Sequence, residues 1–303
     1  MFIGNQQVVN FFDKAIENQA LSQVYCLAGG GQVGKRTLAR EICARLLGTS
    51  VEKLSLHPDF YYLERTENEK TGKMRKEISV DQSRQLRVFL QNQSWNGGYK
   101  AVIIDEAETL NEESGNALLK SLEEASEKCI IFLLTEDENA LLSTIRSRTQ
   151  MITMFLQDKI IIKDGLEKMG CDQKKAEEIC EYANGKMGRA VDFFENQEKF
   201  SVWKNESMRW RGLALKPLYQ RFKEVEDLFI AKEEMVRTQD RLSVVLNIWM
   251  EEAEKMLKEK VENNDQTGMR SGLKSLESIT EVSKLLAQNI NPKMLIEKII
   301  LQF

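Results

Sequence analysis

The segment that most constrains the fold is a glycine-rich loop placed between an apolar run and a helical pattern. The loop, GGGQVGK at residues 29–35, follows the apolar residues 24–28. It matches G-x-x-x-x-G-K, the start of a Walker A loop, whose backbone N–H groups and following helix N-terminus face phosphate. Gly29 and Gly34 permit the tight turn, and Lys35 is placed to meet the outer phosphates. The loop therefore predicts an α/β fold.

The same glycines fit a second pattern. Gly29, Gly31 and Gly34 also match G-x-G-x-x-G, which is typical of dinucleotide-binding folds. That pattern is weak when it stands alone. Lys35 favours the phosphate-loop interpretation.

The residue after the lysine departs from the Walker A pattern. A Ser or Thr normally ligates Mg²⁺ there, but this chain has Arg36, and arginine cannot ligate a cation. Thr37 cannot replace the missing hydroxyl, because adjacent helical residues point about 100° apart. We therefore expect a loop that keeps its shape but has lost turnover.

A second motif supplies carboxylates. The apolar run 101–104 delivers Asp105 and Glu106 to a strand end, as in a Walker B motif. Asp105 is placed to support Mg²⁺, and Glu106 to polarise an attacking water. Ligands of open α/β sheets bind at the carboxyl edge of the strands, beside such a loop. The two motifs together predict the fold of a nucleoside triphosphatase.

The rest of the chain divides into an α/β part and a helical part. Strand patterns alternate with helical ones up to about residue 155, which predicts a parallel sheet. The predicted strands are 24–28, 60–63, 77–80, 101–104 and 130–134, and the predicted helices include 8–18, 35–47 and one that Asp81 caps. Short helices follow, with breaks at Gly170 and at 184–185, and longer amphipathic helices occupy 201–303. Their apolar faces are Leu242, Val245, Leu246 and Trp249 in one helix, and Leu273, Leu276, Ile279, Val282 and Leu286 in another, and Pro292 starts the last helix.

Composition excludes several classes of function. The net charge of −4 argues against a stand-alone nucleic-acid binder, whose surface is usually basic. The five cysteines contain no C-x-x-C pair, so we expect free thiols in a reducing cytoplasm and no zinc site. Neither a signal peptide nor a run of membrane-spanning length is expected.

Residues 103–150 resemble the AAA+ subunits of bacterial clamp loaders, in particular the delta-prime family. The most specific parts are NALLKSLEE at 116–124 and IRSRT at 145–149, which is similar to the family's Ser-Arg-Cys motif with Thr149 in place of the cysteine. Further similar stretches are FIGNQQVVNFFDKAI at 2–16, HPDFYYLE at 57–64, ISVDQSRQL at 78–86 and NINPKMLIEKIILQF at 289–303. The resemblance covers nearly the whole chain and is weakest from 201 to 290.

This resemblance implies an architecture and residue roles. It implies a RecA-like AAA+ domain at 1–155, a helical lid at 156–200 and an all-α collar domain at 201–303, through which loader subunits form their ring. Thr135 matches sensor 1, and Arg189 matches sensor 2 in the lid, although a surface arginine at a helix start is about as good an interpretation of Arg189. Arg148 matches the arginine finger, which reaches the nucleotide of a neighbouring subunit; outside this motif it would be an ordinary surface arginine.

The resemblance also implies a function, with three alternatives. The chain would be a subunit of the DNA polymerase III clamp loader, a cytoplasmic hetero-pentamer that loads the sliding clamp on primer-template DNA. It would act as a stator, supply Arg148 in trans and bind ATP or ADP with Mg²⁺ weakly or not at all. The alternatives are an ATP-hydrolysing motor subunit of the loader, another AAA+ ATPase acting on DNA such as a branch-migration helicase motor, and a scaffold without catalytic residues.

Overall fold

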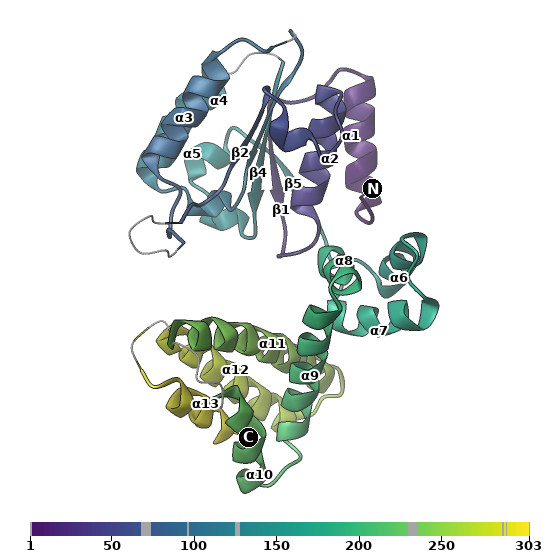
Figure 1. The fold of residues 1–303 in the computed structure, drawn as a ribbon, viewed down its shortest axis with the longest axis vertical. Coiled ribbons are helices and arrows are strands. Elements are labelled where there is room, and N and C mark those ends of the chain that lie inside the picture. The colour runs from purple at the N-terminus through teal and green to yellow at the C-terminus, as the bar shows by residue number, and fades with distance from the viewer. Residues whose placement is uncertain are drawn as a thin grey trace. The chain divides into compact units, whose positions relative to one another are not determined.

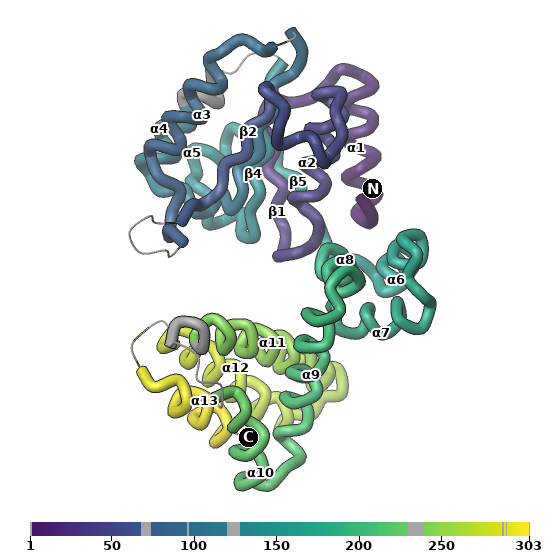
Figure 2. The backbone as a smooth tube through the Cα atoms, in the orientation of Figure 1, coloured from purple at the N-terminus to yellow at the C-terminus, as the bar shows by residue number. Residues whose placement is uncertain are grey.

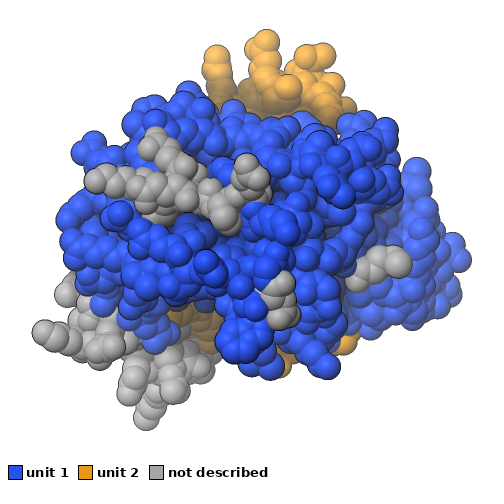
Figure 3. Space-filling model, turned by 90° about the horizontal axis from the view of Figure 1, so that it is seen from above, with its two compact units in different colours: residues 1–195 blue, residues 196–303 orange. Residues whose placement is uncertain are grey.

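The chain forms two compact units in the computed structural model, residues Met1–Glu195 and Asn196–Phe303, which Figure 3 shows in different colours. The structure describes residues 2–67, 74–95, 97–124, 128–229, 235–286, 288 and 290–302. Much of the charged loop at 64–76 therefore lies outside the described residues.

A parallel sheet forms the centre of the first unit (Figure 1). Its strands are β1 Val24–Ala28, β2 Phe60–Leu63, β3 Lys100–Ile104, β4 Cys129–Thr135 and β5 Gln150–Thr153, in the order β2-β3-β4-β1-β5. The register aligns Leu27 of β1 with Leu134 of β4, and Leu63 of β2 with Ile104 of β3. All residues of β1, β3 and β4 are buried, as expected for strands covered on both faces.

Helices cover both faces of this sheet and then continue as a small helical group. Figure 1 shows α1 and α2 on one face and α3 and α4 on the other. The helices of the first unit are α1 Gln6–Glu17, α2 Lys35–Leu47, α3 Val80–Gln91, α4 Glu112–Glu124, α5 Ser143–Arg146, α6 Lys159–Lys168, α7 Gln173–Ala183 and α8 Met187–Glu195. Short 3-10 turns are η1 Leu54–Leu56, η2 Ala107–Thr109 and η3 Glu138–Ala140.

Two predictions in this unit are wrong. Residues 77–80 do not form a strand: Ile78 makes a single parallel bridge to Leu110, and α3 begins at Val80. Nor does Asp81 cap that helix. Ser79 does, because its hydroxyl accepts from the Gln82 N–H while the Gln82 side chain accepts from the Ser79 N–H. This capping box starts the helix where the strand was expected.

The second unit consists of helices around a shared apolar core. They are α9 Gln197–Leu213, α10 Leu218–Val225, η4 Glu226–Leu228, α11 Met235–Glu262, α12 Gln266–Leu286 and α13 Pro292–Ile300. The indoles of Trp210 and Trp249 lie 5.3 Å apart in this core. The predicted face of α11 is buried, but in α12 Leu273 is 52% exposed, so the predicted stripe is one turn too long. Asn291 caps α13, and Pro292 is its first residue.

The boundary between the units falls between α8 and α9, where Figure 2 traces the chain directly from one helix into the next. We predicted boundaries at 155/156 and 200/201 instead. Helix α9 runs across the second of these. The division of the first unit into a sheet domain and a lid stays a prediction. Among the described residues, no helix is long and apolar enough to cross a membrane, and all five cysteines are buried and free.

Candidate functional site: the phosphate loop and the adjoining strand ends

The phosphate loop joins β1 to α2 as the sequence predicts. Gly34 precedes α2 with a φ of 103°, and Gln32 adopts a φ of 63°, a left-handed conformation that is uncommon for a side chain other than glycine. At Gly29 a Cβ would overlap the carbonyl of Met154, so only glycine fits there. The loop thus keeps the tight turn and the helix N-terminus of a phosphate site.

Lys35 is directed back to its own loop. Its ammonium donates to the carbonyls of Gly29 at 2.6 Å and Gly30 at 2.9 Å. Burial lowers the pKa of Lys35, an effect that the nearby Glu136 and Glu108 carboxylates oppose. The lysine is therefore positioned for phosphate but is engaged by backbone oxygens.

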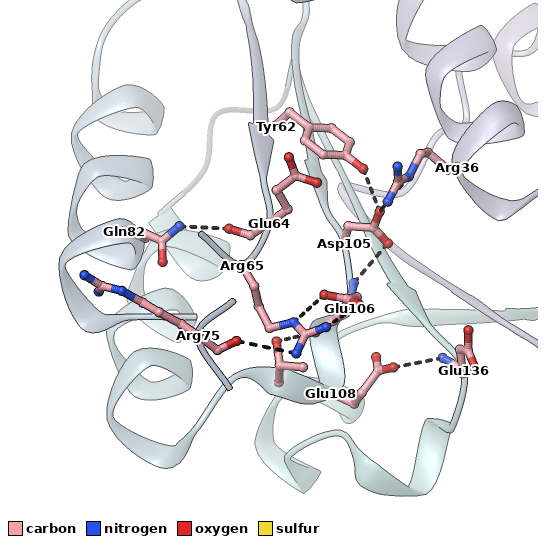
Figure 4. A network of polar contacts seen from close by, with 11 residues as sticks. Arg36, Tyr62, Glu64, Arg65, Arg75, Gln82, Asp105, Glu106, Glu108 and Glu136 are labelled. Carbon is pink, nitrogen blue, oxygen red and sulfur yellow. Dashed lines mark hydrogen bonds and ion pairs between the residues drawn. The ribbon is translucent and has the colours of Figure 1, made fainter. Parts of the chain in front are cut away.

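Arg36 pairs with the first of the two strand-end carboxylates (Figure 4). Its Nε donates to Asp105 Oδ2 at 2.7 Å, and Nη2 forms an ion pair with the same oxygen. The hydroxyl of Tyr62, in β2, donates to Oδ2 as well, at 2.6 Å. Burial opposes the charge of the guanidinium, but Asp105, Tyr62 and Glu64 together raise the pKa of Arg36.

The second carboxylate is held by another arginine. Arg65 Nε donates to Glu106 Oε2 at 2.5 Å, and its Nη2 donates to Oε1 at 2.7 Å, a two-pronged arrangement (Figure 4). This hydrogen-bonded pairing raises the pKa of Arg65. Each Glu106 oxygen thus already accepts one hydrogen bond from Arg65, which would compete with an attacking water for this carboxylate.

Arg36 and the two strand-end carboxylates line a cavity of about 290 Å³ at the carboxyl edge of the sheet. Of the predicted site residues, Gly34, Lys35, Thr37, Asp105, Glu106 and Thr135 line it. Two further carboxylates, Glu108 and Glu136, also line it, so four acidic side chains face two basic ones. An added Cβ at Gly31 would lie 2.6 Å from Glu136 Oε1, so this carboxylate lies against the loop.

The two residues predicted as sensors, Thr135 and Arg189, form hydrogen bonds with other residues of the chain. Thr135 is buried, and its hydroxyl donates to the Asp137 carbonyl at 3.0 Å and accepts from the Asp137 N–H at 3.2 Å. Arg189 is also buried, and its Nε donates to the Gln32 side chain at 2.9 Å. The adjacent Gly188 N–H donates to the Gln32 carbonyl at 2.8 Å. Helix α8 is thereby attached directly to the phosphate loop.

Arg148 lies at the other edge of the sheet. It is exposed, follows α5 and donates to the Thr144 carbonyl at 3.1 Å. It lines a depression together with the first residues of β1 and β5, Val24 and Gln150. The phosphate loop follows the last residue of β1, so the two features sit at opposite ends of that strand. Arg148 is therefore not placed to act on its own chain's loop.

Sequence reasoning missed Tyr62, Arg65, Glu108 and Glu136. A signal existed for the first two, because β2 and β3 are parallel neighbours and side chains after β2 reach the same edge as Asp105. Glu136 directly follows Thr135 at the end of β4. Among the described residues, no group of three or more His, Cys, Asp or Glu side chains is arranged to hold a metal ion.

Comparison with known proteins agrees with this architecture. A family model described as "DNA polymerase III, delta subunit" matches residues 4–158. DNA polymerase III subunit delta' of Pseudomonas aeruginosa is 36% identical over 141 residues, which span 42% of this chain and 41% of that protein. The same subunit of Escherichia coli is 32% identical over 109 residues, 36% of this chain and 31% of that protein. The matches thus span less than half the length of these relatives.

A solved structure extends the fold comparison to nearly the whole chain. A DNA polymerase III gamma subunit-related protein from Thermotoga maritima superposes with a TM-score of 0.53 at 17% identity, covering 96% of this chain and 97% of that one. Sheet, phosphate loop and following helices define a RecA-like AAA+ protein with an all-helical C-terminal region. The chain belongs to the DNA polymerase III delta subunit family, whose model matches slightly more than half of it. The resemblance to clamp-loader delta-prime subunits is thereby confirmed.

Proposed function

We propose that this chain is a stator subunit of a clamp loader that hydrolyses little ATP itself and supplies Arg148 to a neighbouring subunit. The observation that carries the proposal is the internal pairing of both strand-end carboxylates, Asp105 with Arg36 and Glu106 with Arg65. An ATPase needs the first for Mg²⁺ and the second for water.

Family membership supports a set of partners for this chain. The chain would join the other loader subunits in a cytoplasmic hetero-pentamer, through its helical region beyond residue 201, and reach the sliding clamp and primer-template DNA through that complex. The pairing of its carboxylates would leave ADP, ATP and Mg²⁺ bound weakly or not at all, and no zinc is needed.

The position of Arg148 supports a role in trans. A guanidinium that neutralises charge on a transferring phosphoryl group is worth ~10³–10⁵ in rate. Arg148 lies at the sheet edge opposite its own loop, on the exposed surface after α5. This position supports action on a neighbour's nucleotide in preference to its own.

The experiment compares Arg148→Ala, Arg148→Lys and Arg146→Ala in otherwise identical reconstituted loaders. Arg146 is the matched control, because it is an exposed arginine two residues away. We expect Arg148→Ala to assemble normally and to reduce clamp- and DNA-stimulated ATP hydrolysis partly, since the ring has several sites. Lysine should rescue poorly because it lacks the planar fork. Unchanged hydrolysis and clamp loading would favour the scaffold alternative.

The motor-subunit alternative is favoured by one comparison. A protein from Buchnera aphidicola named DNA polymerase III subunit gamma is 30% identical over 208 residues, 64% of this chain and 56% of that protein. Steady-state hydrolysis by the isolated chain separates the two functions. Turnover near ~1 s⁻¹, the low end of typical enzyme rates, would overturn the stator proposal.

A further inference from the structure

The Arg36 guanidinium binds the carboxylate that a Walker B motif uses to support Mg²⁺. Three donors converge on Asp105 Oδ2, namely Arg36 Nε, Arg36 Nη2 and the Tyr62 hydroxyl. The other oxygen, Oδ1, accepts from the Glu106 N–H at 3.0 Å. The guanidinium carbon also lies 5.7 Å from the centre of the Tyr62 ring, which favours a cation on this face.

The rest of the cavity does not fit a metal-bound polyphosphate. Asp105 offers its oxygens to donors already in place, and the residue after Lys35 carries no hydroxyl. Glu136 lies against the turn of the loop, where its negative charge would repel a phosphate. Arg65 already holds both oxygens of Glu106. The residues present therefore disagree with the Mg²⁺-nucleotide that the fold implies.

We propose that Arg36 is a built-in replacement for the divalent cation, so that Asp105 is neutralised by a guanidinium from its own chain and holds no Mg²⁺. This inference deepens the proposed function and rests on it for the identity of the site. The cation that other phosphate loops take from solution is here part of helix α2. The carboxyl edge of the sheet is consequently complete without a cofactor.

The test is the response of the melting temperature of the full chain to MgCl₂, at constant ionic strength, with and without ADP. The variant Arg36→Thr removes the guanidinium and supplies the missing hydroxyl. Wild type should not respond. Arg36→Thr should melt lower than wild type and gain about 2–4 °C on addition of Mg²⁺, the scale on which a single site moves melting in a protein of this size.

Two controls isolate Asp105. The double variant Arg36→Thr, Asp105→Asn should lose the Mg²⁺ response. Arg40→Thr, on the same helix but bound to the Val51 carbonyl, should show none. A wild-type chain that responds as strongly as Arg36→Thr, or an Arg36→Thr variant that does not respond, would overturn the proposal.

A second measurement tests the proposal even if Arg36→Thr does not fold. Mn²⁺ binding to the wild-type chain with ADP is followed by electron paramagnetic resonance. No saturable binding supports the proposal, and saturable binding that Asp105→Asn abolishes overturns it. Neither measurement needs another loader subunit, so failure to assemble would overturn the proposed function and leave this inference standing.

Discussion

Gly188 is the residue at which helix α8 meets the phosphate loop most closely. A Cβ there would lie 2.7 Å from the carbonyl oxygen of Gln32, a backbone atom in a left-handed turn. We expect Gly188→Ala to lower the free energy of unfolding by about 1 kcal/mol or more, because overpacking costs ~1–3 kcal/mol and the helical preference for alanine recovers less than that.

Gly30→Ala is the matched control for Gly188, since an added Cβ at Gly30 meets nothing within 4 Å. Chemical denaturation of both variants measures the difference. Equal free energies of unfolding for the two variants would show that α8 and the loop accommodate the added methyl group without loss of stability.

Glu206 provides a pH-dependent prediction in the second unit. Burial raises the pKa of this carboxyl above its ordinary value of 4.5, with Arg209 opposing and Asp227 reinforcing the shift. The folded chain therefore binds the proton more tightly than the unfolded chain, and this residue's contribution to stability is lost as pH rises above 4.5. We expect Glu206→Gln to gain stability relative to wild type between pH 4.5 and pH 7.

The measurement is thermal melting of wild type and Glu206→Gln across that pH range. Glu254→Gln, which replaces an exposed glutamate of α11, is the control for the same change of side chain outside the core. A Glu206→Gln advantage that shrinks toward neutral pH would contradict the prediction.

At the scale of elements, apolar runs made the central strands predictable. Strand β1 has the predicted bounds, and β3 and β4 extend the predicted runs by one or two residues. Strand β5, Gln150–Thr153, was missed because it is a short edge strand with exposed ends and shows no apolar run. The prediction of a strand at 77–80 was wrong because it rested on the apolar pattern alone. That pattern does not include the hydrogen bonds between Ser79 and Gln82 that start a helix there.

The location of the site was predictable, because the sequence motifs indicate where the backbone of the loop and of the strand lies. The loop and the Walker B strand place Lys35 and Asp105 at one cavity. The parallel register of β2 and β3 brings Arg65 to the edge that holds Glu106, but it does not specify that the two side chains bond. The bond between Arg189 of α8 and Gln32 was not predictable, because the two residues come from distant segments. Spacing along the chain does not encode such pairs.

The start of helix α3 gives a direct test of the corrected cap. Ser79→Ala removes the hydroxyl that accepts from the Gln82 N–H and should cost ~1 kcal/mol of stability. Asp81→Ala, at the position predicted as the cap, should cost only about 0.5 kcal/mol, because its exposed side chain loses only a surface ion pair with Arg84 and an interaction with the helix dipole. Urea denaturation ranks the two variants. A larger loss from Asp81→Ala would restore the original assignment.

At the scale of the whole molecule, the boundary between the two compact units differs from the point at which the sequence pattern changes. The pattern changes near residue 155, where strands end, but the helices α6–α8 remain in one compact unit with the sheet. The hydrogen bonds that join the two parts include three: Gly188 with Gln32, Arg189 with Gln32, and the Asn5 N–H with the Gln157 side chain at 2.8 Å. A change of secondary-structure type therefore marks the end of the sheet and not the end of the unit.

This difference predicts how fragments behave. A fragment of residues 1–195 keeps the three contacts and should fold with a single cooperative melting transition, and residues 196–303 should form a second, helical folding unit around Trp210 and Trp249. A fragment of residues 1–155 loses all three contacts and exposes the loop surface that α8 covers, so it should melt at a lower temperature than 1–195. Thermal unfolding of the three fragments and the full chain, followed by circular dichroism, tests this prediction. Equal melting temperatures for 1–155 and 1–195 would mean that the helices after residue 155 fold independently of the sheet.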